Sequence, residues 1–393
     1  MDAFAQELRD WLEENCPPSM RTPMAADEFP AGGRRATYKN PDTKLWLERM
    51  AERGFTAPLW PQECGGAGLS KAENAVLQAE LRRIGARPPL VGMGLAMIGP
   101  ALLEFGNDAQ RAEHLPKIAR GEIRWCQGYS EPGSGSDLAS LRTSAVADGD
   151  DFVINGQKIW TSGADEADWI FCLVRTAPDA PKHQGITFIL FDMETPGVTV
   201  RPIRLISGLS PFCETFFDDV RALKANVIGQ VNEGWTVAKR LLQYERTSIG
   251  GIGGGNQRLA TVDEVAKQYA GVADGKIADA GIRDAVIAQR INDRSLALSL
   301  RRLGEESAAG KAPGAESSMY KYYATEQNKK RYDLMMSMMG TRGLAWESGD
   351  DAFNEFEFDT TRAWLRSKAN SIEGGTSEVQ LNILAKRVLG LPD

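Results

Sequence analysis

The sequence predicts a multidomain α+β protein in which a helical region is followed by a β region and then by a second helical region. The length indicates several domains, because 393 residues exceed the roughly 150 that one domain typically holds. The spacing of apolar residues indicates their order, because it changes from a helical period to short β-branched and aromatic runs and then back. We expect domains over residues 1–124, 125–232 and 233–393.

The first region is predicted to be helical. The opening stretch MDAFAQELRDWLEENC spaces Phe4, Leu8 and Leu12 as a helix would, and AENAVLQAELRRIG and DAQRAEHLPKIARG continue this pattern beyond a Gly/Pro loop at WPQECGGAGLS. The acidic start does not match a signal peptide. The longest uncharged run, from Leu90 to Leu103, is interrupted by Gly and Pro and is shorter than the ~18 residues of a membrane helix. We therefore expect a cytoplasmic protein with no membrane partner.

The second region is predicted to be all β, and the third helical again. The runs DFVING, DWIFCLV, GITFILF and GVTVRPI are separated by turn signals such as DGDD, NG and PG. Helical spacing then returns in AVIAQRINDRSLALSLRRL and in SEVQLNILAKRVLGL. At the start of the last segment, Ser377 and Gln380 have the spacing of a capping box.

Composition excludes several classes of function. A formal net charge of -7 gives no electrostatic reason to expect nucleic acid or an anionic surface as partner. The five cysteines are odd in number and form no CxxC pair, so we expect reduced thiols. Only two histidines are present, His114 and His183, and neither lies near a cysteine pair. We therefore expect no zinc site and no histidine-based triad.

One charge lies where a helix should be apolar. If the stretch that ends in LLQYERTSIGG is helical, one buried stripe contains Trp235, Ala238, Leu242, Ile249 and Ile252. Glu245 falls on the same stripe. A lone buried carboxylate is unfavourable unless it is paired, hydrogen-bonded or protonated. Glu245 is therefore a functional acid, a member of a core ion pair, or a sign that the helix phase is misjudged.

Two loops of the β region have the residues of a ligand site. YSEPGSGSDL offers backbone N–H groups and the hydroxyls of Ser130, Ser134 and Ser136 to a heterocycle or a phosphate, although an ordinary polar turn is the alternative. NGQKIWTSGADEADW places Trp160 beside two hydroxyls, with a role in the sheet core as the alternative.

A glycine-rich segment, GGIGGG at 250–255, invites a dinucleotide-binding interpretation that we reject. The segment follows a helix rather than a strand, and Asn256 replaces the third glycine of the motif. Its missing side chains favour the close approach of a ligand or of another backbone, with simple helix packing as the alternative.

Six segments together resemble the acyl-CoA dehydrogenase family and occur in its order. They are WPQECGGAGLS, YSEPGSGSDL, INGQKIWTSG, VIGQVNEGW, YERTS and IEGGTSEVQ. The resemblance covers nearly the whole chain, and it implies a β-barrel-like middle domain and a C-terminal domain resembling a four-helix bundle. It also implies bound FAD, oxidation of an acyl-CoA thioester to the trans-2-enoyl-CoA in β-oxidation, and electron transfer to an electron-transfer flavoprotein.

The resemblance implies specific site residues. The FAD site would comprise Gln127, Tyr129, Ser130, Gly135, Ser136, Trp160, Thr161, Ser162, Thr376 and Glu378. The acyl-CoA would contact Ser136, Gln243, Tyr244 and Arg246. Helix capping is the alternative role for Thr376 and Glu378.

The resemblance also selects a catalytic base. One branch of the family takes its base from the segment before GGTSEVQ, and the corresponding position here is Gly374. A second branch, which includes isovaleryl-CoA dehydrogenases and steroid side-chain enzymes, has the base immediately before the helix arginine, which here is Glu245. Glu373 is the rival base, and a solvated loop acid is its alternative role.

The chain departs from the family pattern where homotetrameric members grip the FAD of a neighbouring subunit. Their Arg-x-x-Phe segment corresponds to KQYAGVADGKIADAG, and their Gln-x-x-Gly-Gly segment to SMMGTRG, with Ser337 and Thr341 as the replacements. The departure predicts one of two assemblies. One is a heterotetramer with a second acyl-CoA dehydrogenase-like subunit, and the other is a homo-oligomer in which Arg283 or Arg342 takes over the contact with the neighbouring FAD.

Substrate and activity leave alternatives open. Small residues at 250–255 and in VGMGLAMIG favour a roomy pocket and a bulky acyl chain, as in steroid catabolism, with a long, branched or dicarboxylic acyl group as competitor. The alternative activities are a flavin monooxygenase of the same fold and a non-catalytic scaffold subunit.

Overall fold

The computed structural model describes residues 2–25, 28–250, 261–309, 314–347, 349 and 351–392, of which 243–250, 307 and 308 are described by their backbone alone. The described residues form two compact units. The first unit holds the N-terminal helices, the sheet and the first part of helix α6, through residue 245. The second holds residues 204–210 and the C-terminal helices.

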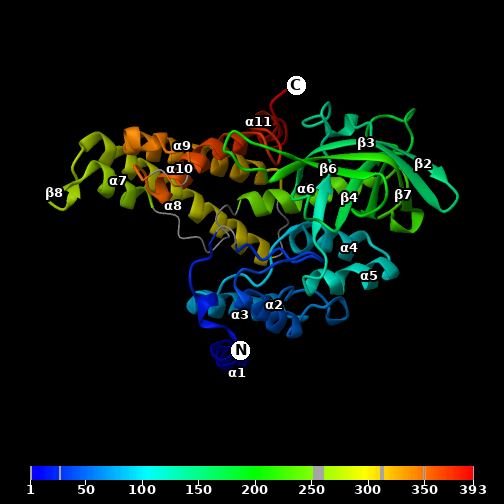
Figure 1. Ribbon diagram of the computed structural model, residues 1–393, viewed down its shortest axis with the longest axis horizontal. Coiled ribbons are helices and arrows are strands. Elements are labelled where there is room, and N and C mark those ends of the chain that lie inside the picture. The colour runs from blue at the N-terminus through cyan, green and yellow to red at the C-terminus, as the bar shows by residue number, and fades with distance from the viewer. Residues whose placement is uncertain are drawn as a thin grey trace. The chain divides into compact units, whose positions relative to one another are not determined.

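The N-terminal domain is helical, as predicted. Its helices are α1 (Asp2–Asn15), α2 (Pro41–Glu52), α3 (Lys71–Arg83), α4 (Gly99–Phe105) and α5 (Asp108–Ala119) (Figure 1). Ser70 starts α3 and Asn107 starts α5, each in a capping box that satisfies the first backbone N–H groups. The side chain of Gln110 in α5 also donates to the carbonyls of Ala225 and Val227, at 2.7 and 2.8 Å. This amide therefore ties the helical domain to the chain that follows the sheet.

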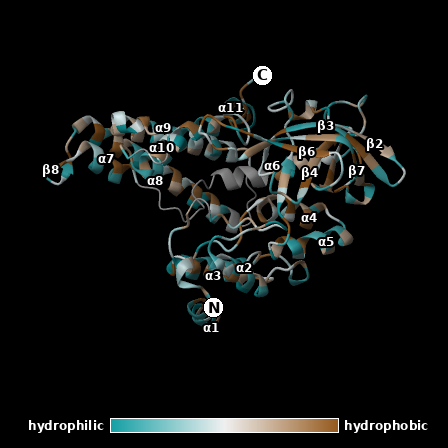
Figure 2. Cartoon of the chain, in the orientation of Figure 1, coloured by the Kyte–Doolittle hydropathy of each residue, from teal (hydrophilic) through white to brown (hydrophobic). Residues whose placement is uncertain are grey.

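The middle domain is a curled seven-stranded sheet. Its strands are β1 (Trp125–Gly128), β2 (Ser144–Asp148), β3 (Asp151–Ser162), β4 (Trp169–Arg175), β5 (Ile186–Asp192), β6 (Val198–Ile203) and β7 (Phe212–Leu223). The order is β1-β4-β2-β3-β7-β6, with β5 on β4. Hydrophobic residues concentrate along these strands (Figure 2). The four runs that predicted strands fall in β3, β4, β5 and β6. The central residues of β4 and β5 are all buried.

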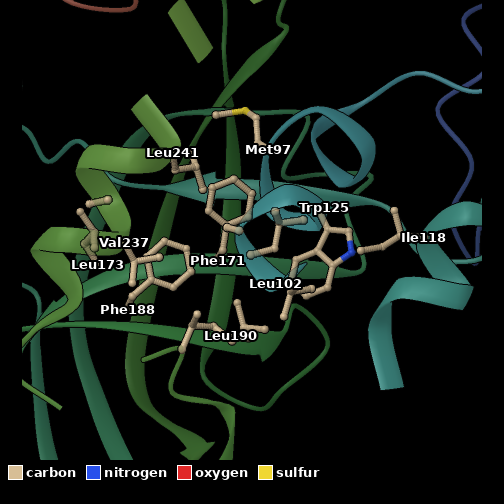
Figure 3. Close-up of a cluster of buried hydrophobic side chains, with 14 of the residues drawn as sticks. Met97, Leu102, Ile118, Trp125, Phe171, Leu173, Phe188, Leu190, Val237 and Leu241 are labelled. Carbon is tan, nitrogen blue, oxygen red and sulfur yellow. The ribbon is translucent and has the colours of Figure 1, made fainter. Parts of the chain in front are cut away.

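The core of the first unit joins both of these domains and α6 (Gly234–Gly250). Phe171 of β4 and Phe188 of β5 stack with ring centroids 6.0 Å apart. Leu102 lies in the same cluster, as do Val237 and Leu241 of α6 (Figure 3). Full burial of a large apolar side chain stabilises by about 1.5–3 kcal/mol. The sheet and α6 therefore hold each other in place.

The C-terminal domain is helical, as predicted. Its elements are α7 (Val262–Ala270), the hairpin β8 (Val272–Ala273) and β9 (Lys276–Ile277), α8 (Ala280–Ala308), α9 (Ser317–Met339), α10 (Glu355–Ser367) and α11 (Ser377–Ile383). Helix α9 is central and packs against the other four helices. The buried carboxylate of Glu357 accepts from Tyr269 at 2.9 Å and from Arg342 at 2.7 Å. This contact joins three segments of the domain.

The capping box predicted at Ser377 and Gln380 is wrong. Thr376 is the residue that caps α11, and its hydroxyl accepts from the Val379 N–H at 3.2 Å. The chain enters the helix with Thr376 extended, so Ser377 already occupies the first helical position. Ser377 instead donates to Glu326 at 3.1 Å, and Gln380 donates to the carbonyl of Gly374 at 3.1 Å.

Cysteine and histidine have structural environments. All five cysteines are free and buried. His114 is buried between Trp125 and Trp169, with ring centroids 5.3 and 4.8 Å away, whereas His183 is exposed beside Trp235. Among the helices described, none combines the length and apolar character that crossing a membrane requires.

Candidate active site

Helix α6 confirms the predicted helix and its phase as far as residue 242. Ala238 is buried and Trp235 and Leu242 are half-buried, while Lys239 is exposed. Val237 and Leu241, which the predicted stripe omits, are also buried. Position 245 is inside the helix, but the side chains of Gln243, Tyr244, Glu245 and Arg246 lie outside the described residues. The same holds for GGIGGG, apart from the backbone of Gly250.

The YSEPGSGSDL segment follows β1 and is folded tightly onto the sheet. Gln127 is half-buried in β1, and the ring of Tyr129 belongs to the core, where it meets Phe171 and Phe188 edge-on. The carbonyl of Ser130 accepts from the Ile159 N–H at 2.9 Å, which joins this loop to β3.

The tip of this loop has an inner and an outer side. Ser134 is buried and donates to the carbonyl of Asp137 at 2.9 Å, so its role is structural. Gly135 and Ser136 are exposed, and a Cβ atom at Gly135 would have no heavy atom of the described residues within 4 Å apart from those of residues 134–136. The loop therefore presents an open edge on a fixed base.

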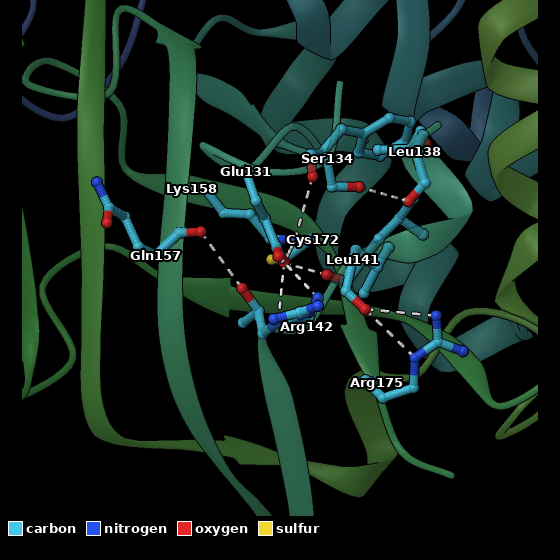
Figure 4. A network of polar contacts seen from close by, with 12 residues as sticks. Glu131, Ser134, Leu138, Leu141, Arg142, Gln157, Lys158, Cys172 and Arg175 are labelled. Carbon is cyan, nitrogen blue, oxygen red and sulfur yellow. Dashed lines mark hydrogen bonds and ion pairs between the residues drawn. The ribbon is translucent and has the colours of Figure 1, made fainter. Parts of the chain in front are cut away.

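A buried ion pair holds the inner side of this loop. The carboxylate of Glu131 accepts from Lys158 Nζ at 2.8 Å and from the N–H groups of Arg142 and Thr143 at 2.7 and 2.8 Å (Figure 4). Lys158 is fully buried and donates to the carbonyl of Tyr129 at 3.1 Å. Burial opposes ionisation of Glu131, but the ammonium group and the hydrogen bonds outweigh it and hold the pKa of this carboxyl below its usual range. The carboxylate of Glu131 therefore stays ionised, and its contacts with Lys158 brace the loop against β3.

Arg175 fixes the far end of the same loop. Its guanidinium donates to the carbonyls of Ala139 at 2.6 Å, Gln184 at 2.8 Å and Lys182 at 3.2 Å. Figure 4 shows its two longer contacts, both 3.4 Å, with the carbonyl of Leu141. One rigid cation thus holds two loops by their backbones.

Trp160 lies at a bulge where β3 loses its register with β7. The backbone of Trp160 has φ 62°, and the residue is 52% exposed. Pairing with β7 breaks between Lys158 and Thr161, so Trp160 points outward and Thr161 is fully buried. The hydroxyl of Thr161 has no hydrogen-bond partner within the described parts of the chain, and Ser162 is half-buried. The exposure of Trp160 rules out its alternative role in the sheet core.

The predicted residues of the C-terminal domain form a separate group in the second unit. Thr376 caps α11, which is the alternative role considered for it, and Glu378 is exposed in the first turn of the helix. Glu373 accepts from Arg366 at 2.6 Å and from the amide of Asn370 at 2.5 Å. These two contacts occupy the carboxylate of Glu373, which counts against Glu373 as the catalytic base.

The two segments that depart from the family pattern have other contacts. KQYAGVADGKIADAG forms the end of α7 and the β8–β9 hairpin, and Arg283 donates to the carbonyl of Ile277 at 2.8 Å. In SMMGTRG, Ser337 donates to the carbonyl of Leu334 within α9, and Thr341 is exposed. Arg342 is bound to Glu357 and lies over the ring of Phe353.

Comparison with known proteins identifies the family. Family models of the acyl-CoA dehydrogenase N-terminal, middle and C-terminal domains match residues 1–122, 126–220 and 232–389. The chain belongs to the acyl-CoA dehydrogenase family. It is therefore an oxidoreductase that acts on CH–CH bonds, and the resemblance seen in the sequence is confirmed.

Three similar proteins cover nearly the full length. Acyl-CoA dehydrogenase IpdE1 of Mycobacterium tuberculosis is 35% identical over 394 residues, covering 100% of this chain and 98% of the relative. The solved structure of the Tcur3481-Tcur3483 steroid ACAD is 29% identical with a TM-score of 0.78, covering 100% of this chain and 97% of that one. The ChsE4-ChsE5 complex from Mycobacterium tuberculosis is 28% identical with a TM-score of 0.73, over 100% and 97%.

The exposed residues fit the flavin that members of this family bind. A flavin needs a flat surface for its ring and nearby donors for its carbonyls and phosphates. Trp160 supplies an exposed ring, and the open edge at Gly135 and Ser136 has space beside the backbone. The buried side chains of Tyr129 and Thr161 fit this role less well than predicted.

Sequence reasoning missed Glu131 and Lys158, although both lie within the quoted segments. Lys158 falls on the inward face of β3 together with Phe152 and Ile154. A charge at an inward position needs a buried partner, and this signal could have identified the pair.

Proposed function

We propose that this protein is an FAD-dependent dehydrogenase that oxidises an acyl-CoA thioester to its trans-2-enoyl-CoA and passes the electrons to an electron-transfer flavoprotein. The observation that carries the proposal is a surface of the middle domain with two parts. Trp160 is exposed there, and the YSEPGSGSDL loop is held in place by the Glu131–Lys158 ion pair. A scaffold subunit would not require this preorganised surface. The family match supports the same conclusion.

Each residue has a proposed role. Trp160 would lie against the flavin ring, and Gln127, Ser130, Gly135 and Ser136 would hold its polar groups. Thr376 and Glu378, at the start of α11, are proposed as further flavin contacts. When bound, the flavin accepts the hydride that leaves the β-carbon of the substrate.

The α-proton goes to Glu245 in this proposal. Position 245 continues the helical face on which Val237, Ala238 and Leu241 are buried, and a desolvated carboxylate is a stronger base than a hydrated one. The competing carboxylate, Glu373, is occupied by Arg366 and Asn370. Arg246, with Gln243 and Tyr244, would orient the thioester beside the base.

The acyl group is proposed to be a steroid side chain or another bulky acyl chain. One solved relative, the Tcur3481-Tcur3483 steroid ACAD, is named for steroids, and its similarity supports a steroid substrate here. A long or branched fatty acyl group and a dicarboxylic acyl group are the competitors.

The assembly is proposed to be a heterotetramer with a second acyl-CoA dehydrogenase-like subunit. Two solved relatives carry paired names, Tcur3481-Tcur3483 and ChsE4-ChsE5, and the second is described as a complex. The contacts within this chain agree, because Arg342 is committed to Glu357 instead of being available to a neighbouring flavin.

Anaerobic titration tests the activity. The purified protein, with any subunit that co-purifies, is mixed without oxygen with a panel of steroid side-chain, branched, long-chain and dicarboxylic acyl-CoAs. We expect the visible absorbance of the bound flavin to fall with at least one bulky acyl-CoA. A flavin that no acyl-CoA bleaches, but that an added reductant does, would contradict the proposal.

A further inference from the structure

Lys321 is a buried lysine that the proposed chemistry does not use. It lies in α9, and its side chain is fully buried. Lysine is rarely buried completely, and an ammonium group inside a protein is strongly unfavourable unless it has hydrogen-bond partners. The position of this charge therefore calls for a reason in its contacts.

The ammonium group of Lys321 holds a segment that lies about fifty residues further on in the chain. Its Nζ donates to the carbonyl of Asn370 at 3.0 Å and to the carbonyl of Gly375 at 2.8 Å. These two carbonyls bracket the loop that leads from α10 into α11. Hydrogen bonds from a charged donor are stronger than those between neutral groups, so this one side chain pins both ends of the loop.

The same helix adds further contacts to the loop. Asn328 donates to the side chain of Asn370 at 2.9 Å, and Lys329 donates to Ser371 at 3.2 Å. Lys321 and Asn328 are seven residues apart and so share one face of α9.

The loop itself contributes little stiffness. Gly374 and Gly375 have φ of 64° and 91°, in the left-handed region that glycine enters without strain. Two consecutive glycines leave a loop many conformations in the unfolded and partly open states. The contacts from α9 therefore help to select one conformation, together with those from Gln380 to Gly374 and from Arg366 to Glu373.

We propose that Lys321 is a positioning residue of the flavin site. By fixing the carbonyls of Asn370 and Gly375 it fixes where α11 begins, and with it Thr376 and Glu378. This inference rests on the proposed function, which assigns those two residues to the flavin. A preordered loop lowers the entropy lost on binding, so removal of Lys321 should weaken FAD binding without changing any group that touches FAD.

Lys321→Met tests the inference, because it removes the donor and keeps most of the volume. Lys330→Met is the matched control, since Lys330 is exposed on the same helix. FAD affinity is measured by titration of apoprotein, together with the thermal unfolding midpoint of that apoprotein and the hydrogen exchange of residues 370–378. We expect FAD binding to weaken about ten- to a hundredfold in Lys321→Met and to stay unchanged in Lys330→Met.

A rescue experiment separates positioning from folding. In Lys321→Ala, n-butylamine should restore FAD affinity by occupying the vacated space and donating to the two carbonyls, whereas n-butanol should restore much less. If Lys321→Met does not fold, the response of Lys321→Ala to n-butylamine decides whether the inference holds. Failure of the amine to restore affinity would overturn the inference.

The outcomes distinguish this inference from the proposed function. If Lys321→Met binds FAD as Lys330→Met does, Lys321 has no positioning role, while bleaching of the wild type still supports the dehydrogenase. If the wild type binds no FAD, the proposed function fails and a flavin role for Lys321 fails with it. Where the wild type binds FAD, faster exchange over residues 370–378 in Lys321→Met than in Lys330→Met supports the inference, and equal exchange overturns it.

Discussion

Glu373 is described by its side-chain contacts, whereas Glu245 is described by its position in α6. Glu373 is bound by Arg366 and Asn370, while position 245 continues a face of α6 that is buried at Val237 and Leu241. We predict that Glu245→Gln lowers the rate of flavin reduction about a hundred- to ten-thousandfold, because a general base contributes a factor of this order. FAD and acyl-CoA binding should remain, because the amide keeps the shape of the side chain.

The measurement is single-turnover reduction with an acyl-CoA that bleaches the wild type. Glu373→Gln is the matched control, and it should reduce the flavin within a small factor of the wild-type rate. An active Glu245→Gln beside an inactive Glu373→Gln would show that the wrong carboxylate was chosen.

His114 makes stability depend on pH. Burial between Trp125 and Trp169 lowers the pKa of His114 from 6.5 to about 4. Between these values the unfolded chain binds a proton that the folded protein does not, so this residue's contribution to stability is present above pH 6.5 and is lost as the pH falls toward 4.

We predict that His114→Phe flattens this dependence. Over the window from 6.5 to about 4, the wild type should lose up to about 1.4 kcal/mol more per pH unit than the variant. Urea unfolding at several pH values measures the difference in slope. Parallel curves for the two proteins would rule out a neutral buried imidazole at this position.

At the scale of elements, the loop after β1 depends on β3 through Glu131 and Lys158. Removing one partner of a buried pair leaves a charge without compensation, so Lys158→Met should destabilise the protein by about 3–5 kcal/mol. Adding Glu131→Gln to Lys158→Met should cause less further loss than Glu131→Gln causes alone. A double-mutant cycle by urea unfolding measures this coupling.

Arg221 and Asp148 provide the control pair in the same sheet. Their side chains are 56% and 57% exposed, and such surface pairs contribute about 0–1 kcal/mol. If the two cycles give equal coupling energies, Glu131 and Lys158 do not brace the loop.

The elements themselves could largely be predicted from the sequence. The apolar runs of β4 and β5 and the helical spacing around α3, α5 and α8 were sufficient, because burial alone imposes these patterns. The start of α11 was displaced by one residue, since Thr376 and Ser377 are both good capping residues and only the path of the preceding chain decides between them.

Which side chains are buried or exposed at the site depends on contacts that the periodicity of the sequence does not reveal. Strict alternation along β3 would put Lys158 and Trp160 on the same face. The bulge opposite β7 reverses the pattern after Lys158, so Trp160 is exposed and Thr161 is buried. The core position of Tyr129 likewise depends on Phe171 and Phe188, which come from strands much later in the chain.

At the scale of the whole molecule, the segments KQYAGVADGKIADAG and SMMGTRG, which depart from the family pattern, bear on how the subunits assemble. Arg342 is bound to Glu357, and Arg283 to the carbonyl of Ile277, so part of each guanidinium is already occupied within this chain. We predict that the chain expressed alone carries less than one FAD per subunit and that co-expression with its partner subunit restores full flavin content. Mass in solution and flavin content measure both. A fully loaded, active homotetramer of this chain would contradict the heterotetramer.

Because every cysteine is buried, the native protein should show little covalent labelling at its thiols. Only the thiolate reacts with alkylating reagents, and burial raises the pKa of each of the five thiols. Alkylation therefore has to wait for local opening. Cys16 and Cys64 would report on the N-terminal helices, and Cys126, Cys172 and Cys213 on the sheet. Mass spectrometry would show the order in which the cysteines are labelled. That order is the order in which the surrounding regions open, and no added probe is needed.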